Sequence, residues 1–91
     1  MAYIFHFSPD AMTSEKYDEC MRRLGAAGAA APAGRLYHAC YGSADRLRVF
    51  DVWDSPESFQ NFGPTLLPIL EDIGIDPGQP EVVETHNIVI G

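Results

Sequence analysis

The sequence predicts a single α+β domain in which four antiparallel strands carry two helices on one face. Three observations point to this class. Segments of strand character and segments of helical periodicity follow one another in the order strand, helix, strand, strand, helix, strand. Clusters of glycine and proline separate these segments. The chain has 91 residues, a length typical of one domain, so residues 1–91 are treated as one unit.

The first part of the chain holds one strand and one helix. Residues 2–7 contain Tyr, Ile and Phe and end at the turn signal Ser8-Pro9-Asp10, which predicts a strand. Thr13 or Ser14 then caps an amphipathic helix that runs to about Leu24. Its apolar face holds Tyr17, Cys20, Met21 and Leu24. Residues 25–34 are small and turn-rich, so we expect the helix end and a connecting loop there.

The middle of the chain predicts a hairpin followed by the second helix. Residues 35–41 and 47–53 are strands joined by a turn at 42–45. Ser55 is the expected N-cap and Pro56 the first helical residue. Spacings of three and four then place an apolar stripe at Phe59, Phe62, Leu66 and Leu70. Because Gly63-Pro64 and Pro68 interrupt the helix, we expect a kink or two short helices.

Residues 81–90 complete the pattern as a long last strand. The resulting βαββαβ order is that of a ferredoxin-like sandwich, whose helices cover only one face of the sheet. Apolar residues occur in both phases of the first strand and of the last strand, so we expect the uncovered face to be apolar as well. A second copy of the chain is the simplest cover, and we expect a homodimer whose sheets face each other.

Composition excludes several classes of partner and cofactor. A formal net charge of −7 repels a phosphate backbone, so nucleic acid is not an expected partner. No apolar run approaches the roughly 18 residues that cross a bilayer, and the first residues lack a signal-peptide pattern. We therefore expect a cytoplasmic protein with Cys20 and Cys40 as buried thiols. No phosphate-binding loop is present, so neither a nucleotide nor a flavin cofactor is expected.

The candidate catalytic residues are the three histidines, His6, His38 and His86, which lie on three different predicted strands. A neutral imidazole is a base for a phenolic or α-carbonyl proton, and a carboxylate such as Asp51 or Glu84 is able to orient it. Taken singly, each histidine has a structural role more often than a catalytic one. No tight His or Cys spacing supports a metal site.

Asp51 is the polar residue of an apolar strand. Because an unpaired buried carboxylate is costly, Asp51 either points into a pocket or pairs with Arg35, Arg48 or a histidine. Trp53 follows in the same phase, either as a flat wall for an aromatic substrate or as core. Tyr37 and Phe62 are further substrate-contact candidates, although tyrosine also suits a sheet edge and the Phe62 stripe also suits a core.

The stretch DVWDSPESFQNF, the later LLPIL and the final THNIV together resemble the antibiotic-biosynthesis monooxygenase-like group of the dimeric α/β-barrel superfamily. The resemblance implies a ferredoxin-like dimer with a small-molecule pocket between sheet and helices. It also implies cofactor-independent oxygenation of aromatic or polyketide-like substrates, with Trp53 as a wall of the pocket. Haem-degrading relatives use an Asn, a Trp and a His, and this chain has no Asn in its first strand and no His in its second helix.

Two functions from different classes remain open from the sequence. The first is a small-molecule enzyme of the oxygenase or isomerase kind with a histidine base. The second is a non-catalytic homodimeric module that binds a small hydrophobic ligand or only stabilises an assembly. A pocket holding two or more of the titratable candidates favours the enzyme, and histidines at the surface around a filled core favour the module.

Overall fold

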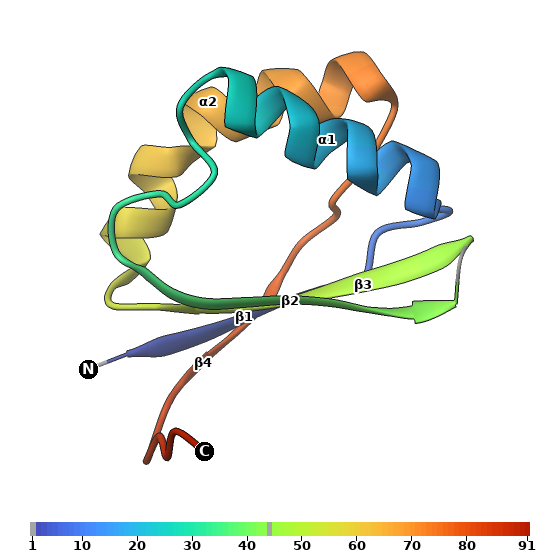
Figure 1. The fold of residues 1–91 in the computed structure, drawn as a ribbon. Helices are drawn as coiled ribbons and strands as arrows, with labels where there is room; N and C mark the ends of the chain where they lie inside the picture. Colours follow the sequence, from blue (N-terminus) through green and yellow to red (C-terminus); the bar gives the residue numbers. More distant parts are fainter. Residues whose placement is uncertain (1, 44) are drawn as a thin grey trace.

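The computed structural model describes residues 2–43 and 45–91 and shows two layers, with both helices on one face of a four-stranded antiparallel sheet (Figure 1). The strand order is β2-β3-β1-β4. This arrangement confirms the ferredoxin-like prediction. In chain order the elements are β1 (Tyr3–Phe7), α1 (Ser14–Ala26), β2 (Arg35–Ser43), β3 (Arg46–Trp53), α2 (Pro56–Ile73) and β4 (Glu81–Glu84).

The register of the sheet sets which side chains share a row. Phe5 of β1 pairs with Asp51 of β3, and Asp51 pairs in turn with His38 of β2. Because neighbouring residues of a strand point to opposite faces, these three side chains lie on the same face. That face is the one the helices cover, since Phe5 belongs to the core beneath them.

Helix α1 begins where its capping residue predicts and continues slightly further than expected. The side chain of Thr13 accepts a hydrogen bond from the Lys16 amide at 3.1 Å, and the helix ends at Ala26 rather than near Leu24. Arg23 binds Glu19 within α1 and Asp72 in α2, which links the two helices at the surface. These ion pairs lie at the surface, where solvent screens them, and contribute little to stability compared with the apolar contacts below them.

Helix α2 is one continuous helix, so of the two alternatives expected at its prolines, a kink or two short helices, the second is wrong. Ser55 caps it by accepting the Ser58 amide at 3.2 Å, and Pro56 occupies the first turn. Pro64 and Pro68 lie inside the helix at exposed positions. A proline removes one donor, but the remaining bonds and the buried stripe hold the helix together. Gly74 ends it with φ of 88°, a left-handed conformation that favours glycine.

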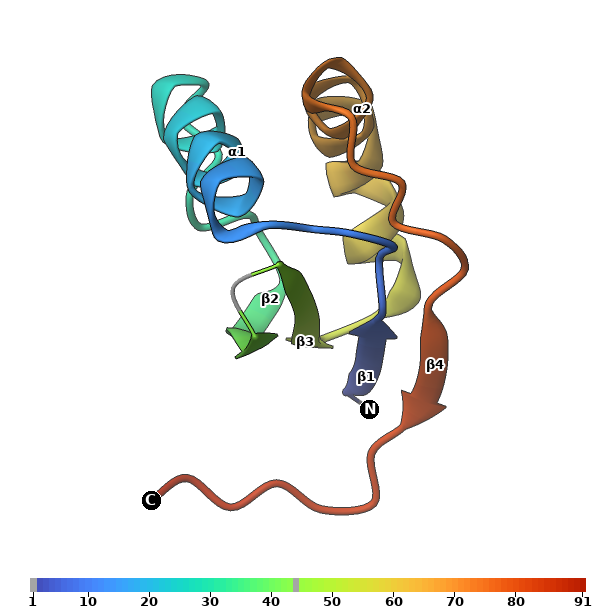
Figure 2. The same ribbon diagram turned by 90° about the vertical axis from the view of Figure 1, so that its right-hand side faces the viewer.

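The last strand is much shorter than the predicted residues 81–90. β4 covers only Glu81–Glu84, because its partner β1 begins at Tyr3. Thr85 makes the final link, with its amide 2.9 Å and its hydroxyl 2.8 Å from the carbonyl oxygen of Ala2. Residues 86–91 then leave the sheet on the side opposite the helices (Figure 2). Pairing across the sheet, and not the apolar pattern, determines where this strand stops.

The hairpin of β2 and β3 is confirmed, with β2 reaching Ser43. Part of the predicted turn, Ala44, lies outside the described residues.

The core lies between the sheet and the helices. Its two most buried large side chains are Trp53, with no exposed surface, and Leu24, with 2%. Trp53 packs edge-on against Phe59, with ring centroids 5.5 Å apart, so the end of β3 and the start of α2 share one aromatic cluster.

Candidate active site

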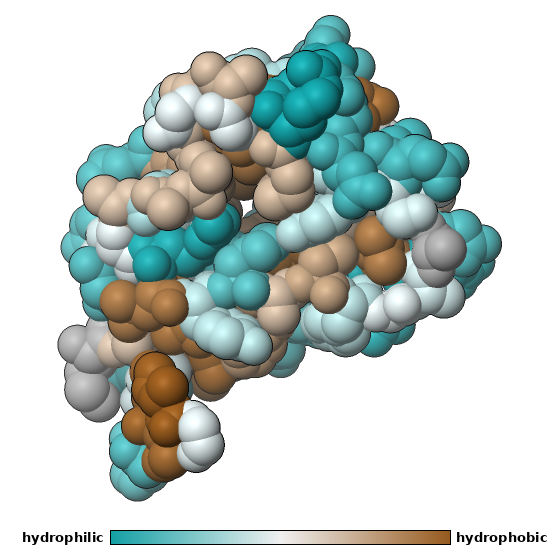
Figure 3. All heavy atoms as spheres, viewed as in Figure 1, coloured by the Kyte–Doolittle hydropathy of each residue, from teal (hydrophilic) through white to brown (hydrophobic). Residues whose placement is uncertain are grey.

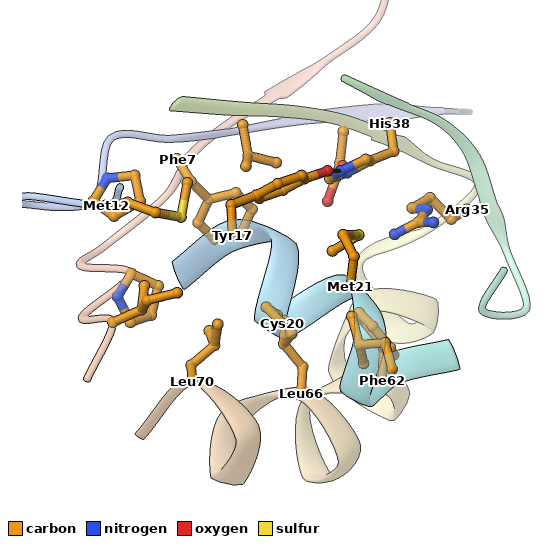
Figure 4. Close-up of a pocket in the computed structure, with 16 residues that line it drawn as sticks. Phe7, Met12, Tyr17, Cys20, Met21, Arg35, His38, Phe62, Leu66 and Leu70 are labelled. Atoms are coloured by element: carbon orange, nitrogen blue, oxygen red, sulfur yellow. Dashed lines mark hydrogen bonds and ion pairs between the residues drawn. The ribbon is translucent and has the colours of Figure 1, made fainter. Parts of the chain in front are cut away.

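A cavity of about 70 Å³ lies between α1, α2 and the covered face of the sheet (Figure 4). Figure 3 shows a narrow opening in the surface between the helical layer and the sheet. The wall is mainly apolar, and its apolar members include Phe7, Met12, Met21, Phe62, Leu66 and Leu70. Its polar members are few and include Tyr17, Arg35, His38 and Asp51. Such a composition is typical of small-molecule sites, where a few polar groups orient a ligand in an apolar wall.

Three of these polar members, Tyr17, His38 and Asp51, form a chain of hydrogen bonds across the cavity. Oη of Tyr17 lies 2.6 Å from Nε2 of His38, and Nδ1 of His38 lies 2.5 Å from Oδ1 of Asp51. Nε1 of Trp53 donates to the other carboxylate oxygen of Asp51 at 3.4 Å. The chain therefore runs from a helix of one layer through a strand of the other layer into the core.

The hydrogen-bond partners define the roles of the two ring nitrogens. A carboxylate only accepts hydrogen bonds, so Nδ1 of His38 donates to Asp51. In the neutral ring Nε2 then carries the lone pair and accepts the hydroxyl proton of Tyr17. Asp51 is only 5% exposed, yet both of its oxygens accept a hydrogen bond, which meets the requirement that a buried polar group be hydrogen-bonded. This is the orienting arrangement of a histidine base and its carboxylate.

Burial beside the cavity favours the neutral forms of Tyr17 and Cys20. Burial is the main cause that raises the pKa of Tyr17 from 10.0 to about 12, so its hydroxyl stays protonated at neutral pH. Burial likewise raises the pKa of the Cys20 thiol beside it. Arg35 opposes the effect on Tyr17, because its positive charge favours the phenolate.

A bulge in β2 directs Arg35 toward the cavity. The register shifts by one residue between Arg35 and Tyr37, so Arg35 pairs with Trp53 and His38 pairs with Asp51. Both therefore lie on the covered face, although strict alternation from Arg35 would place His38 on the opposite face. One end of the cavity consequently combines a cation with the histidine–carboxylate pair.

The structure brings together two of the four predicted catalytic residues, His38 and Asp51. His6 lies on the face of the sheet that the helices leave uncovered, which we call the open face. There its Nε2 is hydrogen-bonded to Tyr41. His86 is exposed in the segment after β4. The three histidines that the sequence offered as alternatives are therefore in three different environments, and one of them, His38, lines the cavity.

The three predicted substrate contacts also lie in different places. Phe62 lines the cavity. Trp53 is completely buried behind Asp51, where its indole N–H holds the carboxylate. Tyr37 is 58% exposed on the open face, with its ring edge-on to Phe50 at a centroid distance of 6.5 Å.

Sequence reasoning did not single out Tyr17 as a site residue. In the sequence, Tyr17 belongs to the apolar stripe of α1 together with Cys20, Met21 and Leu24. The available signal was a single hydroxyl in an otherwise apolar stripe, because a buried tyrosine hydroxyl needs a partner. His38 is that partner.

The described residues contain neither a metal-binding cluster nor a membrane-spanning helix. In residues 2–43 and 45–91, no cluster of three or more His, Cys, Asp or Glu side chains has the arrangement of a metal site. Across the same residues, no helix has the length and apolarity needed to cross a membrane.

Comparison with known proteins gives matches in structure but not in sequence. The sequence matches no model of a protein family, and no curated protein matches it. SnoaB, a cofactor-independent oxygenase from Streptomyces nogalater, is similar in structure with a TM-score of 0.62 and 15% identity, over 97% of this chain and 94% of SnoaB. A protein assigned as an antibiotic biosynthesis monooxygenase from Chloroflexus aurantiacus gives a TM-score of 0.57 and 21% identity, over 99% of this chain and 97% of its own. Over nearly its whole length, the chain therefore has the ferredoxin-like fold that SnoaB and the antibiotic biosynthesis monooxygenase structure share.

Proposed function

We propose that the protein is an acid–base enzyme of the cofactor-independent monooxygenase kind, acting on an aromatic or polyketide-like substrate in the cavity between sheet and helices. The observation that carries the proposal is the hydrogen-bonded chain Tyr17–His38–Asp51 in an apolar cavity. His38 is the base for an acidic hydrogen of the substrate. Asp51 orients the ring and stabilises the imidazolium that forms. The likeness in fold to SnoaB supports the choice of reaction class.

The reaction balances with dioxygen as the only co-reactant. His38 takes a proton from a methylene group that flanking rings or carbonyls make acidic, and the resulting carbanion gives electrons to O₂. A C–O bond forms, and the resulting peroxide anion takes the first proton back from the imidazolium of His38 to give a hydroperoxide. His38 then removes the second hydrogen of the former methylene, the O–O bond breaks and the carbon becomes a carbonyl. The departing hydroxide takes that second proton and leaves as water. The substrate itself is oxidised and supplies the electrons, so the chain needs only to position a base and exclude bulk water.

Cavity size limits which substrates enter without movement. Pockets for drug-sized ligands have volumes of about 300–1,000 Å³, and this cavity has about 70 Å³. A polycyclic substrate therefore requires the helical layer to move away from the sheet. The linker from α1 to β2, rich in glycine and alanine, provides a connection that tolerates such movement.

The small cavity is also the observation that favours the alternative, a non-catalytic module that binds a small hydrophobic ligand. Oxygen uptake separates the two. We expect the protein to consume O₂ in the presence of dithranol, a tricyclic phenol with an activated methylene, and to form the corresponding quinone. His38→Gln is expected to abolish the catalysed rate, and His86→Gln, a control at an exposed histidine, to retain it.

The outcomes of that assay decide between the two functions. Equal rates for the wild-type protein and His38→Gln would exclude His38 as the base. Binding of dithranol without any oxygen uptake above the uncatalysed reaction would support the non-catalytic module.

A homodimer through the open face of the sheet completes the proposal. Ile4, Phe50 and Val83 point away from the helices, and Val83 is 48% exposed. The segment after β4 adds Val89 and Ile90, which are 78% and 92% exposed. An apolar sheet face next to an apolar segment is typical of a surface that another chain covers. A second copy supplies a matching apolar face by symmetry.

A cytoplasmic location is also part of the proposal. Cys20 and Cys40 are both free thiols, a state typical of a reducing compartment.

A further inference from the structure

The Tyr17–His38 hydrogen bond joins the two layers of the fold across the cavity (Figure 4). Tyr17 belongs to α1 and His38 to β2. The two ring planes differ by only 3°, and their centroids are 6.0 Å apart. With 2.6 Å between Oη and Nε2, the rings meet end to end rather than face to face. The phenol hydroxyl therefore points straight at the ring nitrogen that the proposed reaction uses.

A neutral imidazole has one ring nitrogen with a free lone pair. In His38 this is Nε2, because Nδ1 donates to Asp51. The hydroxyl of Tyr17 donates its hydrogen bond to that lone pair. An acidic hydrogen of a ligand has to reach the same lone pair before it can be transferred. Tyr17 and the ligand therefore compete for one atom.

We propose that Tyr17 is a gating residue whose hydroxyl must leave Nε2 of His38 before the acidic hydrogen of a phenolic ligand takes its place. The inference rests on the proposed function in taking His38 as the base. It goes beyond that function in making access to the base depend on a side chain of the helical layer.

The space in the cavity supports the same conclusion. An apolar cavity of about 150 Å³ is known to hold benzene, and this one has about 70 Å³. One aromatic ring therefore does not fit beside Tyr17 in its present position. Rotation of the Tyr17 side chain frees both the lone pair of His38 and the volume next to it. Met21 and Phe62 remain as an apolar wall for the ligand ring.

Binding of 4-nitrophenol to the wild-type protein, Tyr17→Phe and Tyr41→Phe tests the gate. Tyr41 is the matched control, because it also bonds a histidine Nε2, that of His6, but on the open face of the sheet. An increase of the yellow phenolate band over that of the free probe at the same pH reports proton transfer to the protein, and titration gives the dissociation constant. Neither readout requires turnover.

Tyr17→Phe is expected to bind the probe about fivefold more tightly, because a neutral hydrogen bond of about 1 kcal/mol no longer has to be broken. Tyr41→Phe is expected to bind as the wild-type protein does. Unchanged or weaker binding by Tyr17→Phe overturns the gate, and so does the absence of binding by all three proteins. If Tyr17→Phe lowers the melting temperature strongly, Tyr17→Leu, which also lacks the hydroxyl, repeats the comparison.

His38→Gln separates failure of the gate from failure of the proposed function. If His38→Gln still ionises bound 4-nitrophenol as the wild-type protein does, His38 is not the base and both ideas fail. If ionisation is lost in His38→Gln but Tyr17→Phe binds no more tightly than the wild-type protein, His38 is still the base and only the gating role of Tyr17 is excluded.

Discussion

His38 and Asp51 are paired residues of neighbouring strands, and Nδ1 of His38 lies 2.5 Å from Oδ1 of Asp51 on the covered face of the sheet. The strand ladder itself therefore holds the pair in place, and no loop has to be ordered to assemble it. Sites built on strands keep their geometry more precisely than sites on loops.

Replacing Asp51 by Asn is expected to lower turnover by about 10²–10⁴-fold, the usual contribution of acid–base catalysis. The amide has one oxygen that accepts and an NH₂ group that only donates, and it carries no charge, so it neither accepts from both His38 and Trp53 at separate oxygens nor balances an imidazolium. The free energy of unfolding should fall by about 1–3 kcal/mol, since a buried polar partner is lost. Oxygen uptake and urea denaturation measure the two effects. Asp45→Asn at an exposed position is the control, and wild-type turnover in Asp51→Asn would remove Asp51 from the mechanism.

Tyr17 is expected to ionise near pH 12 in the folded protein. Burial, the largest cause, favours the neutral phenol, so folding raises the pKa above its value of 10.0. The contribution of this group to stability is complete below pH 10 and is lost as the pH rises toward 12. The absorbance of tyrosinate, compared between the wild-type protein and Tyr17→Phe, isolates the transition. The same difference measured in urea should appear near pH 10, and a folded-state transition at that pH would contradict the burial of Tyr17.

Both thiols are expected to react slowly with DTNB in the folded protein. Burial raises the pKa of Cys20 and of Cys40, and the thiolate is the reactive form. Cys20 is 3% exposed, whereas Cys40 is less deeply buried, so Cys40 should react first. Labelling of Cys20→Ser and Cys40→Ser at pH 8 assigns the two rates, and urea should release both thiols. Immediate reaction of Cys20 would show that the space beneath α1 opens readily to solvent.

A charge on the open face of the sheet is expected to break the proposed homodimer. Phe50 lies on that face between His6 and Ala39. Phe50→Asp should therefore give a monomer, since an unpaired carboxylate is costly in an apolar interface. Leu67→Asp is the matched control, because Leu67 is an apolar residue 53% exposed on α2. Light scattering after size-exclusion chromatography measures the mass of each, and a monomeric wild-type protein would refute the proposed assembly.

The fold could be predicted from the sequence because each element carries a local signal. The Ser55-Pro56 cap and the stripe from Phe59 to Leu70 define α2, and the apolar run at 47–53 defines β3. The length of β4 could not be predicted in this way. Its end depends on where β1 begins, which is a property of pairing between distant segments.

The candidate site could be predicted only in part. A histidine paired with a carboxylate was expected, but the sequence offered three histidines and two carboxylates as alternatives. The pairing register of β2 with β3 places His38 opposite Asp51. The bulge between Arg35 and Tyr37 brings Arg35 to the same face of the sheet as this pair. The contact with Tyr17 depends on how α1 packs on the sheet, and no spacing within one element reveals that packing.

The most direct test of the acid–base site is the ring ¹⁵N spectrum of His38 in the protein without ligand. The spectra of His6→Gln, His38→Gln and His86→Gln assign the three rings. We predict that neutral His38 carries its proton on Nδ1, with Nε2 accepting a hydrogen bond that disappears in Tyr17→Phe. A His38 ring that shows the mixture of tautomers of the exposed His86 ring would contradict the Tyr17–His38–Asp51 chain, and with it the proposed base.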